Sequence, residues 1–275
     1  PDYVLGHWNL AILHAIQGRF DLALAEADKT AAINQTYTKA QFYHMMWDFK
    51  KAEEEYKKWF NHVSQSTQLL ARERLSYLYR TLGKFEEAKN QILLGIDEAK
   101  IQKDDLYLGI FHHQCAYLCL MAGSFEEAIE AVEKIGHTSA FDTVSRFYDL
   151  ELKGWILAEM GRMDAARETA EEIKRLVESG PYKKRIRHCD FLRGMIALKS
   201  KNYSDAIASF KKALSLLLHP TGFIADDGLY RYYLALAYYE SGNLREARDS
   251  FEELVAFIPG RNTFGDLYAE SYYKL

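Results

Sequence analysis

The sequence predicts an all-α array of about seven repeated helix–turn–helix units. First, a short motif recurs seven times, with an apolar residue just after a turn and an alanine three positions later. Second, apolar residues recur three and four positions apart on both sides of each turn, whereas no segment has the period-2 alternation of a strand. Third, all four prolines lie outside the helical segments, where each would cost about 3 kcal/mol.

The motif copies give the order of the turns along the chain. Four clear copies span Gly18–Ala23, Gly83–Ala88, Gly123–Ala128 and Gly161–Ala166, and three looser copies span Trp47–Ala52, Lys201–Ala206 and Gly242–Ala247. Glycine suits the end of a helix at which the chain must reverse. Because Trp47 stands where its neighbours have glycine, we expect a local irregularity in the second unit.

Each turn lies in the middle of one helical pair, and the turns therefore set the approximate bounds of the units. The pairs are expected over residues 3–34, 35–63, 68–101, 105–137, 143–179, 183–219 and 227–259, with a terminal helix over residues 263–275. The chain begins at Pro1 and stops in what reads as the first helix of another unit. We therefore expect a single repeat array that is a fragment of a larger protein.

The residues of each unit resemble the tetratricopeptide repeat, whose pattern is W-x2-L-G-x2-Y, then A-x3-F, then P. The last unit matches best, through Leu234, Tyr238, Ala247, Phe251 and Pro259. Partial matches are Leu75 and Tyr79 with Ala88 and Ile92, Gly154 and Leu157 with Ala166, and Gly194 with Ala206 and Phe210. The resemblance covers essentially the whole chain. It implies a right-handed superhelical solenoid in which small residues pack where two helices cross.

Two segments also resemble the repeat arrays of bacterial multidomain signalling proteins. They are residues 73–88 and residues 264–275. In those proteins the array follows a kinase, a cyclase or a propeller-type module. This resemblance implies a signalling context.

Bulk composition excludes several classes of partner. A net charge of -4 and a pI near 6.2 give no electrostatic attraction to nucleic acid. No apolar run approaches the ~20 residues that span a bilayer, so membrane insertion is not expected. The three cysteines, Cys115, Cys119 and Cys189, are too few and odd in number for a disulfide framework, which favours a reducing compartment. We expect a cytoplasmic location, and an exposed array end leaves self-association open.

The first helix of each pair carries the candidate binding surface, because in the family that the chain resembles these helices line a concave groove. Aromatic residues are frequent on this face, and such residues dominate binding hot spots. The candidate peptide-binding residues are Trp8, Tyr37, Tyr77, His113, Tyr117, Trp155, Phe191, Met195 and Tyr232. The alternative is that some of them pack against neighbouring repeats. A Lys/Asn/Arg clamp for a C-terminal carboxylate is not expected, because aromatic and aliphatic residues stand at its positions.

Two further clusters have both a functional and a structural interpretation. His112, Cys115 and Cys119 share one helix face and suit zinc, although free cysteine also packs as a small buried hydrophobe. The basic run at residues 183–188 could bind a phosphate or an acidic peptide end, or form a solvated helix start. We expect core packing for the first cluster, and therefore no metal and no cofactor.

The predicted function is a non-catalytic scaffold that binds a peptide or protein segment in an aromatic-lined concave groove. No phosphate-binding loop, zinc-protease motif or nucleophile elbow occurs in the sequence, so an enzyme is not expected. The alternative is a regulatory or sensory domain of a multidomain signalling enzyme. Its groove would take a small ligand or a segment of the enzyme itself.

Overall fold

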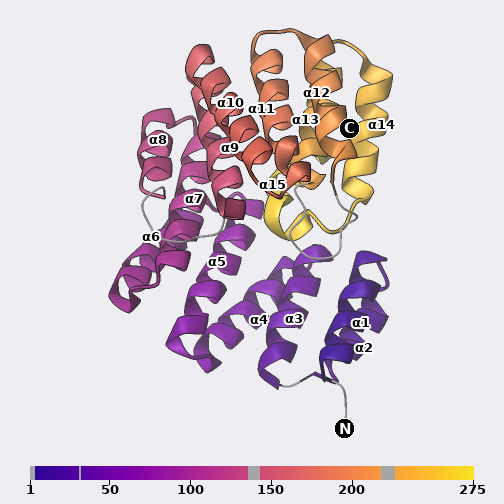
Figure 1. Cartoon of the computed structure of the whole chain (residues 1–275). Helices are drawn as coiled ribbons and strands as arrows, with labels where there is room; N and C mark the ends of the chain where they lie inside the picture. The colour runs from indigo at the N-terminus through magenta and orange to yellow at the C-terminus, as the bar shows by residue number, and fades with distance from the viewer. Residues whose placement is uncertain (1–3, 31, 136–142, 218–226) are drawn as a thin grey trace.

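The computed structural model describes residues 4–30, 32–135, 143–217 and 227–275. Within these ranges the only regular structures are fifteen α-helices and one 3-10 turn, with no strand. They form helix–turn–helix pairs in series, followed by one further helix (Figure 1). The predicted fold class, an all-α superhelical solenoid of about seven pairs plus a terminal helix, is confirmed.

The helix bounds follow the turns that the motif predicts. The pairs are α1 (Val4–Ile16) with α2 (Phe20–Ala27), α3 (Ala32–Met45) with α4 (Phe49–His62), α5 (Gln65–Thr81) with α6 (Phe85–Gln102), α7 (Asp105–Met121) with α8 (Phe125–Glu133), α9 (Thr143–Glu159) with α10 (Met163–Ser179), α11 (Ile186–Lys199) with α12 (Tyr203–Ser215), and α13 (Asp227–Glu240) with α14 (Leu244–Ala256). The 3-10 turn η1 (Lys183–Arg185) precedes α11, and α15 (Arg261–Lys274) ends the array.

The turns between paired helices require a left-handed residue. At Gly83 φ is 68°, and the N–H groups of Gly83 and Lys84 donate to the carbonyls of Arg80 and Tyr79. Two turns place a non-glycine residue in this conformation: Trp47 has φ 66° and Lys201 has φ 57°. The irregularity at Trp47 is thus one of backbone conformation, since an L side chain is strained there.

Small residues form the seam between paired helices and between neighbouring pairs. The alanine of every motif copy is buried: Ala23, Ala52, Ala88, Ala128, Ala166, Ala206 and Ala247. A Cβ added at Gly154 would lie 2.2 Å from a methyl carbon of Leu192, and one at Gly194 would lie 2.5 Å from the Phe210 ring. Glycine therefore allows a large side chain of a neighbouring helix to fill the crossing.

The array curls far enough for its last helix to contact its early repeats. Helix α15 packs on α13 and α14, its neighbours in sequence, and also on α3 and α5 (Figure 1). The turn before α15 contacts the first pair, because Ile258 lies against Gly18 and packs on the cluster that includes Ala11 and Phe42. This closure decides which part of the inner face remains accessible.

Candidate functional site

The inner face is the side of the array that is lined by the first helices α1, α3, α5, α7, α9, α11 and α13. Helix α15 packs on α3, α5 and α13 among these helices and is also contacted by Tyr117 of α7, so it lies on that side. Figure 1 shows it between the early and the late repeats. The residues predicted to line the groove therefore fall into two groups, according to whether they face α15 and the late repeats.

Five of the nine predicted groove residues are buried in this structure. Exposed fractions are 5% for Tyr117, 2% for Trp155, 0% for Phe191 and Met195, and 3% for Tyr232. All five belong to one hydrophobic cluster, in which the rings of Trp155 and Phe191 lie 6.2 Å apart. The expectation of an open channel at these positions does not fit the structure. The curl of the repeats and the docking of α15 convert this stretch of the inner face into core.

The other four predicted residues, Trp8, Tyr37, Tyr77 and His113, are half-buried. Tyr77 donates a hydrogen bond to Glu73 at 3.2 Å, and the Arg74 guanidinium lies 5.7 Å from the centre of the Tyr77 ring. We call Tyr37, Glu73, Arg74, Tyr77 and His113 the inner-face rim. It combines aromatic surface with paired charges, on α3, α5 and α7.

His113 extends the inner-face rim toward α9. Its Nδ1 lies 2.9 Å from the Asp149 carboxylate, and both side chains are partly exposed. Beside its tyrosine rings, the inner-face rim therefore exposes the His113 imidazole with the Asp149 carboxylate next to it, whereas Glu73 and Arg74 are largely buried. Such a surface can hold a polypeptide through side-chain stacking and polar contacts.

Helix α15 is held on the inner face by a buried charge pair. The Arg80 Nε lies 3.3 Å from Asp266 Oδ2, and the Arg80 guanidinium also donates to the Thr263 carbonyl. Its charge lies 4.4 Å from the centre of the Tyr117 ring, and the Tyr117 hydroxyl donates to Asp266 at 3.4 Å. Burial alone would lower the pKa of Arg80, but Asp266 and the tyrosines beside it raise the pKa, so Arg80 stays charged.

A second anchor lies at the start of α15. The Arg261 guanidinium donates to the Met45 carbonyl at 3.0 Å and lies 5.5 Å from the centre of the Trp47 ring. Tyr268 lies against the same indole, with ring centres 6.2 Å apart. Trp47 therefore does more than form a strained turn, because it also receives the last helix.

Several buried polar atoms around α15 have no hydrogen-bond partner among the described residues. On α15 they are both amide atoms of Asn262, Oγ1 of Thr263 and Oδ1 of Asp266. Across from α15 they include Nδ1 of His44, on a ring that is 1% exposed. Burial, with Arg74 and Arg80 nearby, lowers the pKa of His44 to about 3. The seat of α15 is therefore polar, and α15 satisfies it incompletely.

The sequence predictions missed a second buried polar cluster. His188 Nδ1 lies 2.8 Å from Glu151 Oε2, and the Tyr230 hydroxyl donates to the same oxygen at 2.6 Å. His188 is fully buried, with the Phe147 ring stacked on it. Burial raises the pKa of Glu151 to about 8. The first helices α9, α11 and α13 bring these three residues together.

The basic run at residues 183–188 supplies part of this cluster. His188 faces the interior, and Arg185 donates to the Tyr148 hydroxyl at 3.1 Å. Arg187 is also buried. A purely solvated helix start therefore does not describe the run. The sequence signal that could have found the cluster is the position of His188, on the same face as the predicted groove residue Phe191.

The cysteine-containing face of α7 packs into the protein. His112 and Cys119 are buried, and Cys119 belongs to the same cluster as Ala116 and Ala128. Cys119 lies 3.8 Å from a Glu127 oxygen. In the described ranges, no group of three or more His, Cys, Asp or Glu side chains is placed to hold a metal ion.

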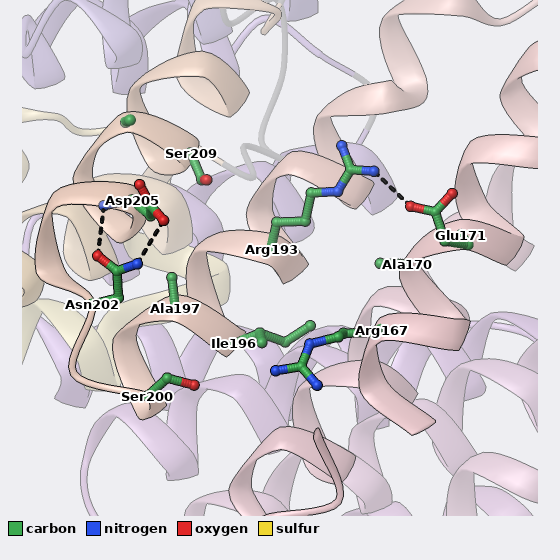
Figure 2. Close-up of a pocket in the computed structure, with 11 residues that line it drawn as sticks. Arg167, Ala170, Glu171, Arg193, Ile196, Ala197, Ser200, Asn202, Asp205 and Ser209 are labelled. Carbon is green, nitrogen blue, oxygen red and sulfur yellow. Dashed lines mark hydrogen bonds and ion pairs between the residues drawn. The ribbon is translucent and has the colours of Figure 1, made fainter. Parts of the chain in front are cut away.

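A separate cleft of about 650 Å³ lies among α10, α11 and α12 (Figure 2). Ala170, Ile196 and Ala197 contribute apolar surface to it. Two hydrogen bonds join polar groups of its lining: Arg193 donates to Glu171 at 2.7 Å, and the Asn202 amide donates to Asp205 at 2.6 Å. None of the predicted groove residues lines this cleft.

The comparisons with known proteins agree with this geometry. Family models described as tetratricopeptide repeat match residues 4–29 and residues 191–262. The helical pairs of the described residues thus have the architecture of a tetratricopeptide repeat array. No curated protein is significantly similar to it. Among the described helices, none combines the length and the apolar composition needed to cross a lipid bilayer.

Solved structures share the fold at low sequence identity. NprR, in complex with its cognate peptide NprX, is 18% identical with a TM-score of 0.60, over 98% of this chain and 82% of that one. A STAND signal-transduction ATPase with a tetratricopeptide repeat sensor, from Pyrococcus horikoshii, is 15% identical with a TM-score of 0.59. That match covers 98% of this chain and 46% of the ATPase chain. The type IV pilus biogenesis factor PilW is 15% identical with a TM-score of 0.51, over 88% and 99% of the two chains.

Proposed function

We propose that the array is a non-catalytic scaffold that binds a segment of a partner protein on its inner face. The fold is that of protein-interaction arrays, whose repeats present one extended surface to a partner. NprR, which shares the fold, is a protein whose structure holds a cognate peptide. The proposal for this chain rests on its own side chains.

The observation that carries the proposal is the inner-face rim. Tyr37, Tyr77 and His113 are half-buried aromatic rings on three successive first helices, with Glu73 and Arg74 among them. An aromatic surface beside hydrogen-bonding groups is the composition of binding hot spots. A bound segment would run across α3, α5 and α7, with its affinity spread over several repeats.

The test uses variants of the inner-face rim, since the buried Tyr117 and Trp155 cannot be removed without damage to the core. A photo-crosslinking residue at position 77 captures the partner, and the affinity of the purified partner is then measured by calorimetry. We expect Tyr77→Ala to weaken binding about tenfold or more.

The matched control is Phe85→Ala. This aromatic residue lies on the second helix α6 and is 51% exposed, so its loss should change affinity less than about twofold. Equal losses in the two variants, or a partner that crosslinks at position 85 and not at position 77, would contradict the proposal.

A sensory role in a larger signalling protein is the second candidate. It is supported by the position of α15 on the inner face, because a segment of the same polypeptide can contact that surface. The STAND ATPase shares the fold and is described as having a repeat sensor. If this candidate holds, an activity elsewhere in the full-length protein should change when Tyr77→Ala is introduced. An unchanged activity and unchanged response would remove it.

A further inference from the structure

The contact between α15 and the inner face has the form of a recognition site with three adjacent parts. The Phe264 ring lies 6.3 Å from the Tyr117 ring, which gives an aromatic contact. Two residues later, the Asp266 carboxylate meets Arg80 at 3.3 Å and accepts from the Tyr117 hydroxyl at 3.4 Å. Tyr117 and Arg80 thus contact both side chains of one short segment.

Gly265, the residue between Phe264 and Asp266, packs directly against Thr81 of α5. A Cβ added at Gly265 would lie 2.3 Å from Oγ1 of Thr81 and 2.6 Å from its methyl carbon. Any larger residue would force the segment away from α5. The seat therefore favours an aromatic residue, a glycine and an acid in succession.

The main chain of the segment also contacts the inner face, through a hydrogen bond from a side chain of α5. Phe264 departs from helical geometry, with φ −122° and ψ 31°, and the Thr263 carbonyl accepts from Arg80. The first part of α15 is therefore a broken helix whose opened backbone takes a side-chain donor of α5.

The fit of α15 is incomplete, and this makes it exchangeable. Among the described residues, the Asn262 amide, Thr263 Oγ1 and Asp266 Oδ1 are buried without hydrogen-bond partners. Each such group has lost its hydrogen bonds to water without gaining a partner, which disfavours the docked state. Near the far end of the helix, Tyr273 makes little contact and is 90% exposed, although Ser271 is buried. A segment of another protein that filled the seat without leaving such groups unpaired would bind it better.

From these contacts we propose that α15 is an internal ligand of the inner face, which a partner segment carrying an aromatic–glycine–acid sequence displaces. The inference rests on the proposed function and names the chemistry of the partner. Arg80 supplies the reason for the acid, because a buried guanidinium requires a carboxylate whenever the seat is filled. Since α15 is tethered, it competes at a high effective concentration and sets a threshold for binding.

The experiment uses the full chain and a fluorescent synthetic peptide with the sequence of residues 261–275, followed by anisotropy. In Asp266→Ala and in Gly265→Val chains, the internal segment is weakened whereas the seat on α5 and α7 is intact. We expect these chains to bind the peptide at least about tenfold more tightly than the wild-type chain. Tyr273→Ala is the matched control, and it should behave as the wild type.

Specificity is read from the peptide. Peptides with Asp266→Asn or Gly265→Val should bind the Asp266→Ala chain at least about tenfold more weakly than the unaltered peptide. Adding Arg80→Ala to that chain should have a similar effect. Equal binding of all peptides, or no gain over Tyr273→Ala in chains whose circular dichroism shows intact folding, would overturn the proposal.

A second measurement covers the case in which the opened variants do not fold. Hydrogen exchange of the wild-type chain is recorded with excess unlabelled peptide. Faster exchange in α15, with α5 still protected, supports displacement, and unchanged exchange in α15 at saturating peptide contradicts it. The two proposals fail separately, because capture of a partner through Tyr77 does not depend on whether this peptide binds.

Discussion

Arg80 and Asp266 form a buried ion pair between the third helical pair and the last helix of the chain, with side chains 6% and 15% exposed. The pair joins segments that no repeat-to-repeat contact would bring together. Because both charges are largely removed from water, loss of one partner leaves the other poorly compensated.

A double-mutant cycle of Arg80→Ala and Asp266→Ala should give a coupling of about 1–3 kcal/mol in the free energy of unfolding, measured by urea denaturation. Arg248 and Glu252 form the comparison pair, 3.7 Å apart and about 60% exposed. Their coupling should stay below about 0.5 kcal/mol, because solvent screens them. Equal couplings in the two cycles would show that α15 is not docked through Arg80.

Lys201→Gly should stabilise the array. Lys201 has φ 57° on an exposed turn, and this left-handed conformation costs an L residue roughly 1–2 kcal/mol. Glycine avoids that strain, and the free-energy cost of the extra entropy that it gives the unfolded chain is slightly smaller. We expect a gain of about 0.5–1 kcal/mol by denaturation. The reverse change, Gly83→Ala, meets no atom within 4 Å and should destabilise by a similar amount through the backbone alone. A loss of stability in Lys201→Gly would argue against this turn geometry.

Gly194→Ala should destabilise the array although alanine is the better helix former. The added Cβ would lie 2.5 Å from the fully buried Phe210 ring. Overpacking costs about 1–3 kcal/mol, which exceeds the gain of about 1 kcal/mol in helix propensity. The thermal midpoint should fall, and Phe210→Leu in the same chain should recover part of the loss. No recovery in the double variant would mean that the clash is not with this ring.

Glu151 should make stability fall as the pH rises. Its folded pKa of about 8 lies above its ordinary value of 4.5, so the folded state holds the extra proton. The contribution of Glu151 to the free energy of unfolding is fully present below pH 4.5 and is lost as the pH rises through 8. Glu151→Gln should therefore gain stability relative to the wild type between pH 5 and pH 9 in urea titrations. The exposed Glu246→Gln serves as control, and parallel curves for the two variants would refute the assignment.

His44 should act in the opposite direction. Its pKa is lowered from 6.5 to about 3, so the unfolded chain takes up a proton that the folded chain does not. The contribution of His44 to the free energy of unfolding is fully present above pH 6.5. It is lost toward pH 3, by at most about 1.4 kcal/mol per pH unit. His44→Gln should flatten the unfolding curve between pH 6.5 and pH 4. The same slope in variant and wild type would place the titration on other groups.

The repeats themselves could be predicted from the sequence because their signals are local. Gly83, Ala88 and their counterparts mark each turn and seam within a few residues, and the structure has helices on both sides of each. Tyr77 and His113, which the same register predicts as groove residues, are half-buried, and their role in binding stays a prediction. Within one repeat, helix periodicity and turn chemistry suffice.

The closure of the array could not be predicted in this way. It depends on small rotations that add up over several repeats, and no single residue encodes their sum. Tyr117 and Trp155 therefore have the register of groove residues but are buried, since α15 and the late repeats lie against them. The pairing of Arg80 with Asp266 has no signal in sequence spacing either.

Ile258 beside Gly18 and Arg261 beside Met45 fasten the tail of the chain to its opening repeats. An unfastened solenoid melts piecemeal, since each unit depends only on the next one. Here the contacts of Ile258 and Arg261 couple the unfolding of the first repeat to that of the last. Heating should therefore give one sharp unfolding transition and not a gradual loss of helix from the ends. A bound partner that displaces α15 would remove this contact, and binding on α5 and α7 would then also change the stability of the first repeats.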